Sequence, residues 1–240
     1  MQNQTTLSPL RCNPLLYGSL FSGIGGIDLG FDRAGLKCAW QVEIDPFARK
    51  VLDKHWPGVP KHDDIRTFKP AQVDVVCGGF PCQDISNAGK REGIDGKRSG
   101  LWAEMFRIVC EIRPRFVVVE NVSALRNRGL DRVLGNLARS GYDAEWSLFS
   151  ACQMGAPHTR ERMFIVAYSN SQPCNWEQCS RIERTQDRDK KWNVHEQWTR
   201  NEPSRVADGI PNSVDANRCL GNAVVPVIAE WIGRRLIESV

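Results

Sequence analysis

The sequence predicts an α/β fold, a mostly parallel β-sheet with helices on both faces. Short apolar runs alternate with amphipathic segments of helical length through the first 170 residues, which is typical of βαβ units. Helix start and stop signals separate the segments, for example Asp45 before Pro46 and Pro114 after an apolar stripe. The chain has 240 residues, of which 41% are hydrophobic, enough for one substantial core.

These patterns also place the individual elements. We expect strands at 15–21, 38–43, 73–78, 115–120, 145–150 and 162–168, where the runs are apolar or alternating. We expect helices after the glycines near residue 25, over 46–55, along the stripe Leu101, Met105, Ile108 and Ile112, along Leu130, Val133, Leu134 and Leu137, and from about Pro226. In such sheets, ligands bind outside the carboxyl ends of the strands.

The polar segment 170–204 differs from the rest of the chain. It mixes both charge signs, carries three tryptophans and shows no sustained periodicity. We therefore expect a small irregular insert there rather than further strands and helices of the sheet.

The composition limits the cellular setting and the partners. Nine cysteines, an odd number without regular spacing, together with a start that lacks the features of a secretory signal, predict free thiols and a cytoplasmic location. No apolar stretch approaches the roughly 20 residues that span a bilayer, so we expect no membrane partner. The net charge of +4 permits a nucleic-acid partner without requiring one.

The stretch "LFSGIGGIDLGF" (20–31) predicts a strand, a Gly-rich turn and a helix, the arrangement that holds nucleotide-like cofactors. Its spacing is not G-x-G-x-x-G, because Asp28 stands three residues after Gly25. An acid in the first turn of the helix would repel a pyrophosphate, so a cofactor without phosphates fits better. Glu43, at the end of the next strand, is placed to accept hydrogen bonds from ribose hydroxyls. A plain tight turn with a solvated glutamate remains the alternative.

Cys82, in "CGGFPCQDIS" (77–86), follows a buried strand and two glycines, so it should face the ligand crevice. The loop 89–100 behind it is rich in basic residues and glycine, which favours a thiolate and suits a lid. Cys77, Cys110 and Cys152 are expected to be buried and inert, as most free cysteines are.

Glu120 ends the apolar run "RFVVVE" (115–120) beside the same crevice. A carboxyl group among apolar residues can have a raised pKa and stay protonated near neutral pH. A Cys–His protease would have to use His158, the one histidine near an ordered motif. A zinc site would have to come from Cys174, Cys179 and His195, which lack a fourth ligand, so we expect no metal.

Taken in order, the motifs resemble those of the DNA (cytosine-5)-methyltransferases. The matching pieces are "LFSGIGGIDLGF", "VEIDPFA", "DDI", "GGFPCQDIS", "ENV", "GAPHTRERMFIVA" and "GNAVVP". The resemblance implies a Rossmann-like methyltransferase fold that binds S-adenosylmethionine and methylates a cytosine flipped out of double-stranded DNA. It also implies one catalytic domain, formed by 1–169 and 205–240, with 170–204 as a shortened target-recognition insert.

The resemblance assigns roles to individual residues. Cys82 would be the thiolate that adds to carbon 6 of cytosine, Glu120 would protonate or hydrogen-bond N3, and Arg160 and Arg162 would hold the base. The implied cofactor contacts are Phe21, Ser22, Gly23, Gly25, Gly26, Glu43, Ile44, Asp64, Ile65, Gly79, Pro81, Leu101, Asn222 and Val224. The implied DNA contacts lie in the segment after the nucleophile, at Ser86, Lys90, Arg91, Lys97 and Arg98.

The chain departs from the family pattern in three places. Ser19 stands where the family usually has aspartate near the methionine moiety, and His158 replaces a glutamine. The recognition region at 170–204 is also much shorter than usual. These departures leave open a catalytically weak DNA-binding homologue, although Cys82 and Glu120 are intact. The motifs do not separate a DNA enzyme from a transfer-RNA cytosine-5 methyltransferase of the same fold. We expect a monomer, with a cognate restriction endonuclease as a candidate partner.

Overall fold

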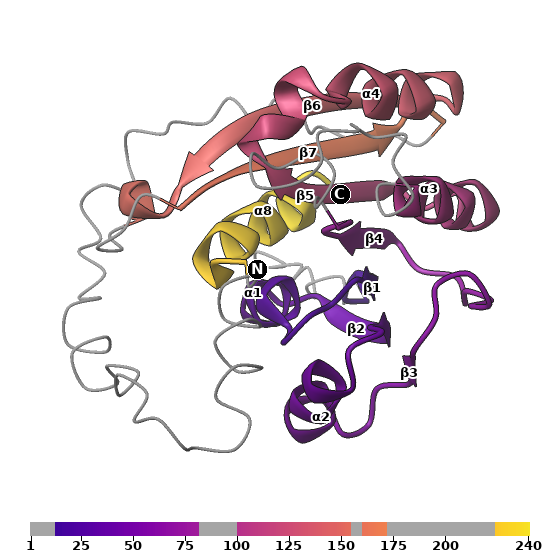
Figure 1. Cartoon of the computed structure of the whole chain (residues 1–240), viewed down its shortest axis with the longest axis vertical. Helices are drawn as coiled ribbons and strands as arrows, with labels where there is room; N and C mark the ends of the chain where they lie inside the picture. Colours follow the sequence, from indigo (N-terminus) through magenta and orange to yellow (C-terminus); the bar gives the residue numbers. More distant parts are fainter. Residues whose placement is uncertain (1–12, 82–99, 155–159, 172–223) are drawn as a thin grey trace, which may run out of the picture.

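Seven strands form one sheet in the order β3-β2-β1-β4-β5-β7-β6 (Figure 1). The computed structural model describes residues 13–81, 100–154, 160–171 and 224–240. The strands are β1 (Leu16–Leu20), β2 (Lys37–Val42), β3 (Lys61–His62), β4 (Val75–Gly78), β5 (Phe116–Val122), β6 (Tyr142–Ser150) and β7 (Glu161–Ser169). Strands β1 to β5 are parallel to one another, whereas β7 runs antiparallel to both β5 and β6. The sheet is therefore mostly parallel, as predicted.

Helices cover both faces of this sheet. They are α1 (Gly26–Ala34), α2 (Pro46–His55), α3 (Leu101–Ile112), α4 (Leu130–Arg139) and α8 (Pro226–Glu238), with short 3-10 turns η2 (Ser123–Asn127) and η3 (Ala151–Met154). Apolar residues of α1 and α8 form one core with the sheet, and those of α3 and α4 form a second core on the opposite face. In the ranges that the structure describes, every helix is too short or too polar to span a lipid bilayer.

The alternation of side chains along β5 explains how one strand serves both cores. Phe116 and Val118 belong to the core under α1 and α8, whereas Val117 and Val119 belong to the core under α3. All four side chains are fully buried, which is why the run reads as continuously apolar.

Helix α8, from the far end of the sequence, lies beside α1, the helix that follows the first strand (Figure 1). Small residues allow the close approach: a side chain on Gly26 would come within 2.6 Å of the backbone oxygen of Val224, and one on Gly233 within 2.8 Å of Ala34. The segment that precedes α8 is thereby held against the Gly-rich turn that follows β1.

Most predicted elements are confirmed, and helices 46–55 and 101–112 have the expected bounds. The two-residue strand β3 was not predicted, and β5 continues beyond Glu120 to Val122. The burial expected for Cys110 and Cys152 is wrong, since both are exposed. Cys110 lies on the outer side of α3, and Cys152 follows the edge strand β6. Of the predicted insert, 172–204 lies outside the described residues.

Candidate active site

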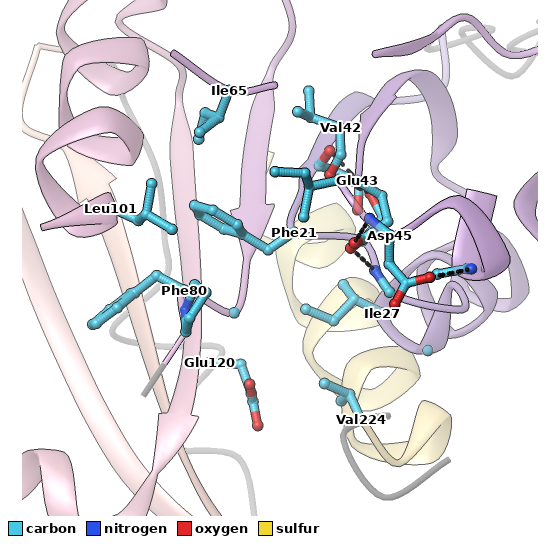
Figure 2. Close-up of a pocket in the computed structure, with 18 of the residues that line it drawn as sticks. Phe21, Ile27, Val42, Glu43, Asp45, Ile65, Phe80, Leu101, Glu120 and Val224 are labelled. Atoms are coloured by element: carbon cyan, nitrogen blue, oxygen red, sulfur yellow. Dashed lines mark hydrogen bonds between the residues drawn. The ribbon is translucent and has the colours of Figure 1, made fainter. Parts of the chain in front are cut away.

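A pocket of about 500 Å³ lies at the carboxyl ends of the parallel strands, the edge where ligands of such sheets bind. Its wall comes from the turn after β1, the end of β2, the loop after β3, the loop after β4, the start of α3, the end of β5 and the start of β7. The lining residues that matter below are Ser19, Phe21, Gly23, Glu43, Asp45, Asp64, Gly79, Pro81, Leu101, Glu120, Arg162 and Val224. Figure 2 shows Phe21 and Leu101 pointing toward each other, with Glu43 on one side and Glu120 on the other.

The turn after β1 has an unusual backbone. Phe21, a non-glycine residue, has φ of +53°, and Gly25, the N-cap of α1, has φ of +86°. The left-handed region costs a non-glycine residue about 1–2 kcal/mol, so packing must hold Phe21 in place. Its ring packs against the core under α3. The turn is therefore a fixed wall of the pocket.

Glu43 is anchored by backbone donors at the end of β2. Its Oε2 accepts from the N–H of Gly23 at 2.7 Å, and its Oε1 accepts from the N–H of Asp45 at 2.8 Å (Figure 2). Asp45 in turn caps α2, because its side chain accepts from the N–H groups of Phe47 and Ala48. Each carboxylate oxygen of Glu43 keeps further lone pairs for a ligand, so the group is oriented before anything binds.

The loop after β3 forms another wall. Asp64 accepts hydrogen bonds from the Arg66 guanidinium, which lowers the pKa of this partly exposed carboxyl group. Ile65 is buried, and its carbonyl oxygen accepts from Arg107 of α3 at 2.8 Å. This contact fixes the loop against α3, 42 residues further along the chain.

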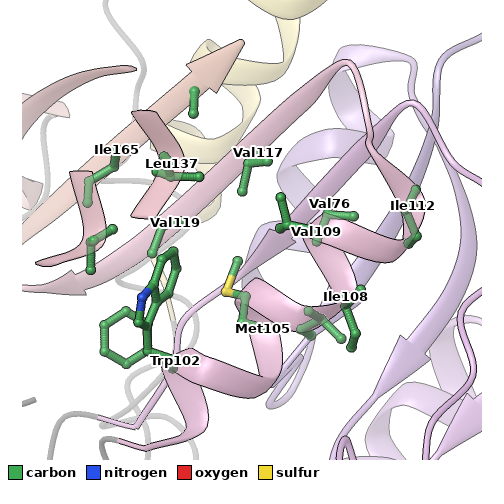
Figure 3. Packing of buried hydrophobic residues seen from close by; sticks show 14 of the residues in the cluster. Val76, Trp102, Met105, Ile108, Val109, Ile112, Val117, Val119, Leu137 and Ile165 are labelled. Carbon is green, nitrogen blue, oxygen red and sulfur yellow. The ribbon is translucent and has the colours of Figure 1, made fainter. Parts of the chain in front are cut away.

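Helix α3 carries Leu101 into the pocket and is itself firmly packed. Trp102, Met105, Ile108 and Ile112 lie along its buried side against β4 and β5 (Figure 3). The Trp102 ring lies 5.6 Å from that of Phe80, which is also in the pocket wall, and its Nε1 donates to Asn136 of α4. The start of α3 is thus held close to the end of β4.

Glu120 lies at the end of β5 and is 8% exposed. Its Oε1 is 3.1 Å from Nε of Arg162, at the start of β7. Burial raises its pKa to about 7, although Arg162 and Arg160 act in the opposite direction. A side chain on Gly79 would come within 2.5 Å of Oε2 of Glu120, so the glycine makes room for this carboxyl group. At neutral pH, Glu120 can therefore either donate or accept a proton.

The structure brings most of the predicted residues together. Twelve of the fourteen expected cofactor contacts line the pocket with Glu120 and Arg162. Gly25 lies outside the lining, and a side chain there would meet the Trp56 ring. Arg160 also lies outside the lining, where its charge still acts on Glu120. Outside the described residues lie Cys82, Ser86, Lys90, Arg91, Lys97, Arg98, Asn222, His158 and the hypothetical zinc ligands Cys174, Cys179 and His195. Across the described ranges, no cluster of three or more His, Cys, Asp or Glu is arranged to hold a metal ion.

Sequence reasoning gave no role to several pocket residues. Asn121 lines the pocket and donates from Nδ2 to the carbonyl oxygen of Phe80 at 3.1 Å, which joins the ends of β5 and β4. Its signal was present, since a second polar residue directly follows Glu120 in an otherwise apolar strand. Asp45 and Arg66 were also missed as lining residues, because their place depends on how two loops fold back over the sheet.

The chain is similar in sequence to known proteins. The family model for "C-5 cytosine-specific DNA methylase" matches residues 16–207. The chain is 39% identical over 158 residues to Type II methyltransferase M2.BsuMI of Bacillus subtilis (strain 168). The match covers 62% of this chain and 41% of that protein. It is 36% identical over 165 residues to Type II methyltransferase M1.ScrFI of Lactococcus lactis subsp. cremoris. That match covers 65% of this chain and 42% of the relative.

A solved structure gives the same picture of the fold. It is described as a DNA modification methyltransferase encoded within a prophage (E. coli) and matches with a TM-score of 0.54 and 27% identity. The match covers 65% of this chain and 47% of that one. The likeness confirms the fold class expected from the sequence. The chain spans less than half the length of each of these three proteins.

Proposed function

Because this chain belongs to the C-5 cytosine-specific DNA methylase family, we propose that it transfers a methyl group from S-adenosylmethionine to carbon 5 of cytosine in DNA. The observation that carries the proposal is the pairing of Glu120 with Arg162 in the same pocket as Glu43. One carboxyl group is tuned to exchange a proton near neutral pH, and the other is oriented to accept hydrogen bonds from a ligand.

The described pocket fits the proposed cofactor. Its volume of about 500 Å³ lies in the range of small-molecule sites. Glu43 offers acceptor lone pairs for the ribose hydroxyls of the cofactor, and Asp64 offers an acceptor for its adenine. Phe21 and Leu101 supply apolar surface. When bound, S-adenosylmethionine supplies an electrophilic methyl carbon on a sulfonium.

The chain's own residues would activate the cytosine. Cys82, the residue after the pocket-lining Pro81, would form a bond from its sulfur to carbon 6. The electrons of the 5,6 double bond would then shift to the 4,5 bond and those of the 3,4 double bond to N3, which makes carbon 5 nucleophilic. Glu120 would give its proton to N3 and so neutralise the charge that builds there. After the transfer, loss of the proton from carbon 5 and cleavage of the sulfur–carbon bond would restore the aromatic base.

Arg162 would serve this step in two ways. Its Nε holds Glu120 at 3.1 Å, and its remaining N–H groups could hold the O2 oxygen of the base. Arg160 would add positive charge on the same side, since it already lowers the pKa of Glu120.

The proposed partner is double-stranded DNA, from which the target cytosine is flipped out. The proposed DNA contacts remain Ser86, Lys90, Arg91, Lys97 and Arg98, and the proposed recognition insert remains 170–204. We also propose a cytoplasmic monomer and a cognate restriction endonuclease as a second partner.

The experiment is a labelled-methyl assay that offers duplex DNA and transfer RNA to the wild type and to two cysteine variants. We expect transfer to DNA by the wild type and by Cys110→Ser, a matched control on the exposed side of α3, and none by Cys82→Ser. Duplex carrying 5-fluorocytosine should trap a covalent adduct with the wild type. Labelling of transfer RNA alone would overturn the DNA assignment, and absence of the adduct during turnover would overturn the covalent route.

A further inference from the structure

Asp28, in the first turn of α1, is a fully buried carboxylate that the proposed reaction does not use. Its Oδ2 accepts from Oγ of Ser19 at 3.0 Å, and its Oδ1 accepts from Nε2 of Gln41 at 2.8 Å. No Lys or Arg in the described ranges forms an ion pair with it. Burial raises the pKa of Asp28 to about 6, so it is mostly charged at neutral pH.

Hydrogen bonding alone does not explain why an acid stands at this position. Burying an unpaired carboxylate is costly, and Oε1 of Gln41 is buried without a hydrogen-bond donor among the described residues. An asparagine at position 28 could accept from Ser19 and, with the Gln41 amide turned over, donate to that oxygen. A neutral network would therefore keep the hydrogen bonds to Ser19 and Gln41 without burying a charge. The feature that only the acid supplies is its charge.

The charge lies under the middle of the pocket. Ser19, which lines the pocket, is at the end of β1, and β1 lies between β2 and β4 in the sheet. Glu43 directly follows β2 on one side, and Glu120 lies near the carboxyl end of β5, beyond β4, on the other. A cofactor whose ribose meets Glu43 and whose methyl group reaches a base beside Glu120 must place its sulfonium over the end of β1.

The charge also reverses the usual preference of such a turn. The N-terminus of α1 carries a partial positive charge that attracts phosphates and repels cations. The N-cap, Gly25, has no side chain to cap the helix, and the acid in the first turn is Asp28. Asp28 offsets the positive helix end at the point where a positively charged sulfur would approach.

Building on the proposed function, we propose that Asp28 determines cofactor specificity, because its buried negative charge makes the pocket favour the sulfonium of S-adenosylmethionine over the neutral sulfur of S-adenosylhomocysteine. The two ligands share the adenosine and the amino acid and differ in one methyl group and one positive charge. Contacts to the shared parts cancel in the ratio of the two affinities, whereas an attraction to Asp28 does not.

The first test measures the dissociation constants of both ligands by calorimetry at neutral pH. We expect Asp28→Asn to weaken the binding of S-adenosylmethionine about tenfold, the factor that corresponds to one moderate charge interaction. The affinity for S-adenosylhomocysteine should change little. Asp32→Asn is the matched control: Asp32 lies one turn further along α1 and accepts from Tyr17 and Trp56. The affinity ratio should not change in this control.

The second test uses pH and needs no change at position 28. Protonating Asp28 removes its charge, so the preference for the sulfonium should be present above pH 6 and disappear as the pH falls below it. Glu120 also titrates in the pocket, with a pKa of about 7, so the titration is done in a Glu120→Gln background. The other groups that face or neighbour Asp28 are Tyr17 of β1, Cys38 and Gln41 of β2, Cys77 of β4 and Asp32 of α1. Burial raises the pKa of the tyrosine and of both thiols, so these stay neutral in the titration.

The outcomes separate this inference from the proposed function. Equal weakening of both ligands in a folded Asp28→Asn protein, or an unchanged ratio, would overturn the inference and leave the proposed function standing. If that variant does not fold, the pH series decides, and a constant ratio from about pH 7.5 to about pH 5 overturns it. If the wild type binds neither ligand, the proposed function fails, and the inference fails with it.

Discussion

Glu43 and Glu120 occupy equivalent positions at two ends of one pocket, yet their surroundings are opposite. Each lies at the carboxyl end of a parallel strand, β2 or β5. Glu43 accepts from two backbone N–H groups, those of Gly23 and Asp45. Glu120 is buried, pairs with the side chain of Arg162, and has a pKa raised to about 7.

The difference shows how one sheet edge can serve both binding and chemistry. Backbone donors cannot change their protonation state, so they hold Glu43 as a fixed acceptor for a ligand. A buried carboxyl group with a nearby arginine lies close to the balance between its two protonation states, as a general acid or base should. The position at a strand end gives access to the ligand, and the local donors decide the role.

The largest expected effect comes from replacing the acid of the catalytic end. Glu120→Gln keeps the size of the side chain but cannot give up a proton, so methyl transfer should fall by about 10²- to 10⁴-fold. Cofactor affinity, measured by calorimetry, should change little. Glu161→Gln, an exposed glutamate beside Arg162, is the control and should keep its activity. A similar loss in both variants would mean that Glu120 does not act as a proton donor.

The pH dependence of the free energy of unfolding tests the raised pKa of the same carboxyl group. Folding raises the pKa of Glu120 from 4.5 to about 7. Between these values the folded chain holds a proton that the unfolded chain has released, so the free energy of unfolding falls as pH rises. Relative to Glu120→Gln, the wild type should lose about 3 kcal/mol from below pH 4.5 to above pH 7, at 1.36 kcal/mol per pKa unit.

Urea unfolding of both proteins across this pH range measures the difference. Arg162→Met removes the guanidinium that lowers the pKa of Glu120, so in that variant the fall should extend to higher pH. A stability difference that is constant with pH would show that Glu120 keeps an ordinary pKa in the folded chain.

The sequence predicted elements well where local chemistry defines them. Asp45 and Pro46 mark the start of α2, and Pro114 lies just beyond the end of α3. Strand β3 escaped prediction because its two residues are extended by pairing with Gln41 and Val42 of β2 rather than by a pattern of their own. The reversed direction of β7 likewise depends on tertiary packing. The exposure of Cys110 was readable, since it lies off the stripe of Met105 and Ile108.

The candidate site was predicted in its residues but not in its bonding. Glu43 and Glu120 were found because an acid after an apolar strand is conspicuous. The donors of Glu43 come from a turn 20 residues earlier and from the next helix cap, and no spacing rule relates them. The room that Gly79 makes for Glu120 could not be read either, because it depends on the distance between two neighbouring strands.

A smaller effect is expected at the binding end of the pocket. Glu43→Ala removes the acceptor for the ribose and also leaves the N–H groups of Gly23 and Asp45 without their partner. Cofactor affinity should fall by about 1–3 kcal/mol, the range for losing hydrogen bonds to a charged group. The affinity of Glu43→Gln should lie between those of Glu43→Ala and the wild type. Calorimetry measures this, with Asp63→Asn, an exposed acid of the same pocket wall, as control. Equal affinities for Glu43→Ala and the wild type would remove Glu43 from the binding site.

The smallest effect separates the cap of α2 from the anchor of Glu43, since Asp45 takes part in both. Its side chain caps the helix, whereas its backbone N–H holds Glu43. Asp45→Ala should therefore cost about 1 kcal/mol of stability, as lost N-caps do, yet largely keep cofactor affinity because the backbone N–H remains. Asp45→Asn, which can still cap, should restore the stability in urea unfolding. If Asp45→Ala weakens the cofactor as much as Glu43→Ala does, the helix cap positions the ribose acceptor, and the backbone donors alone are insufficient.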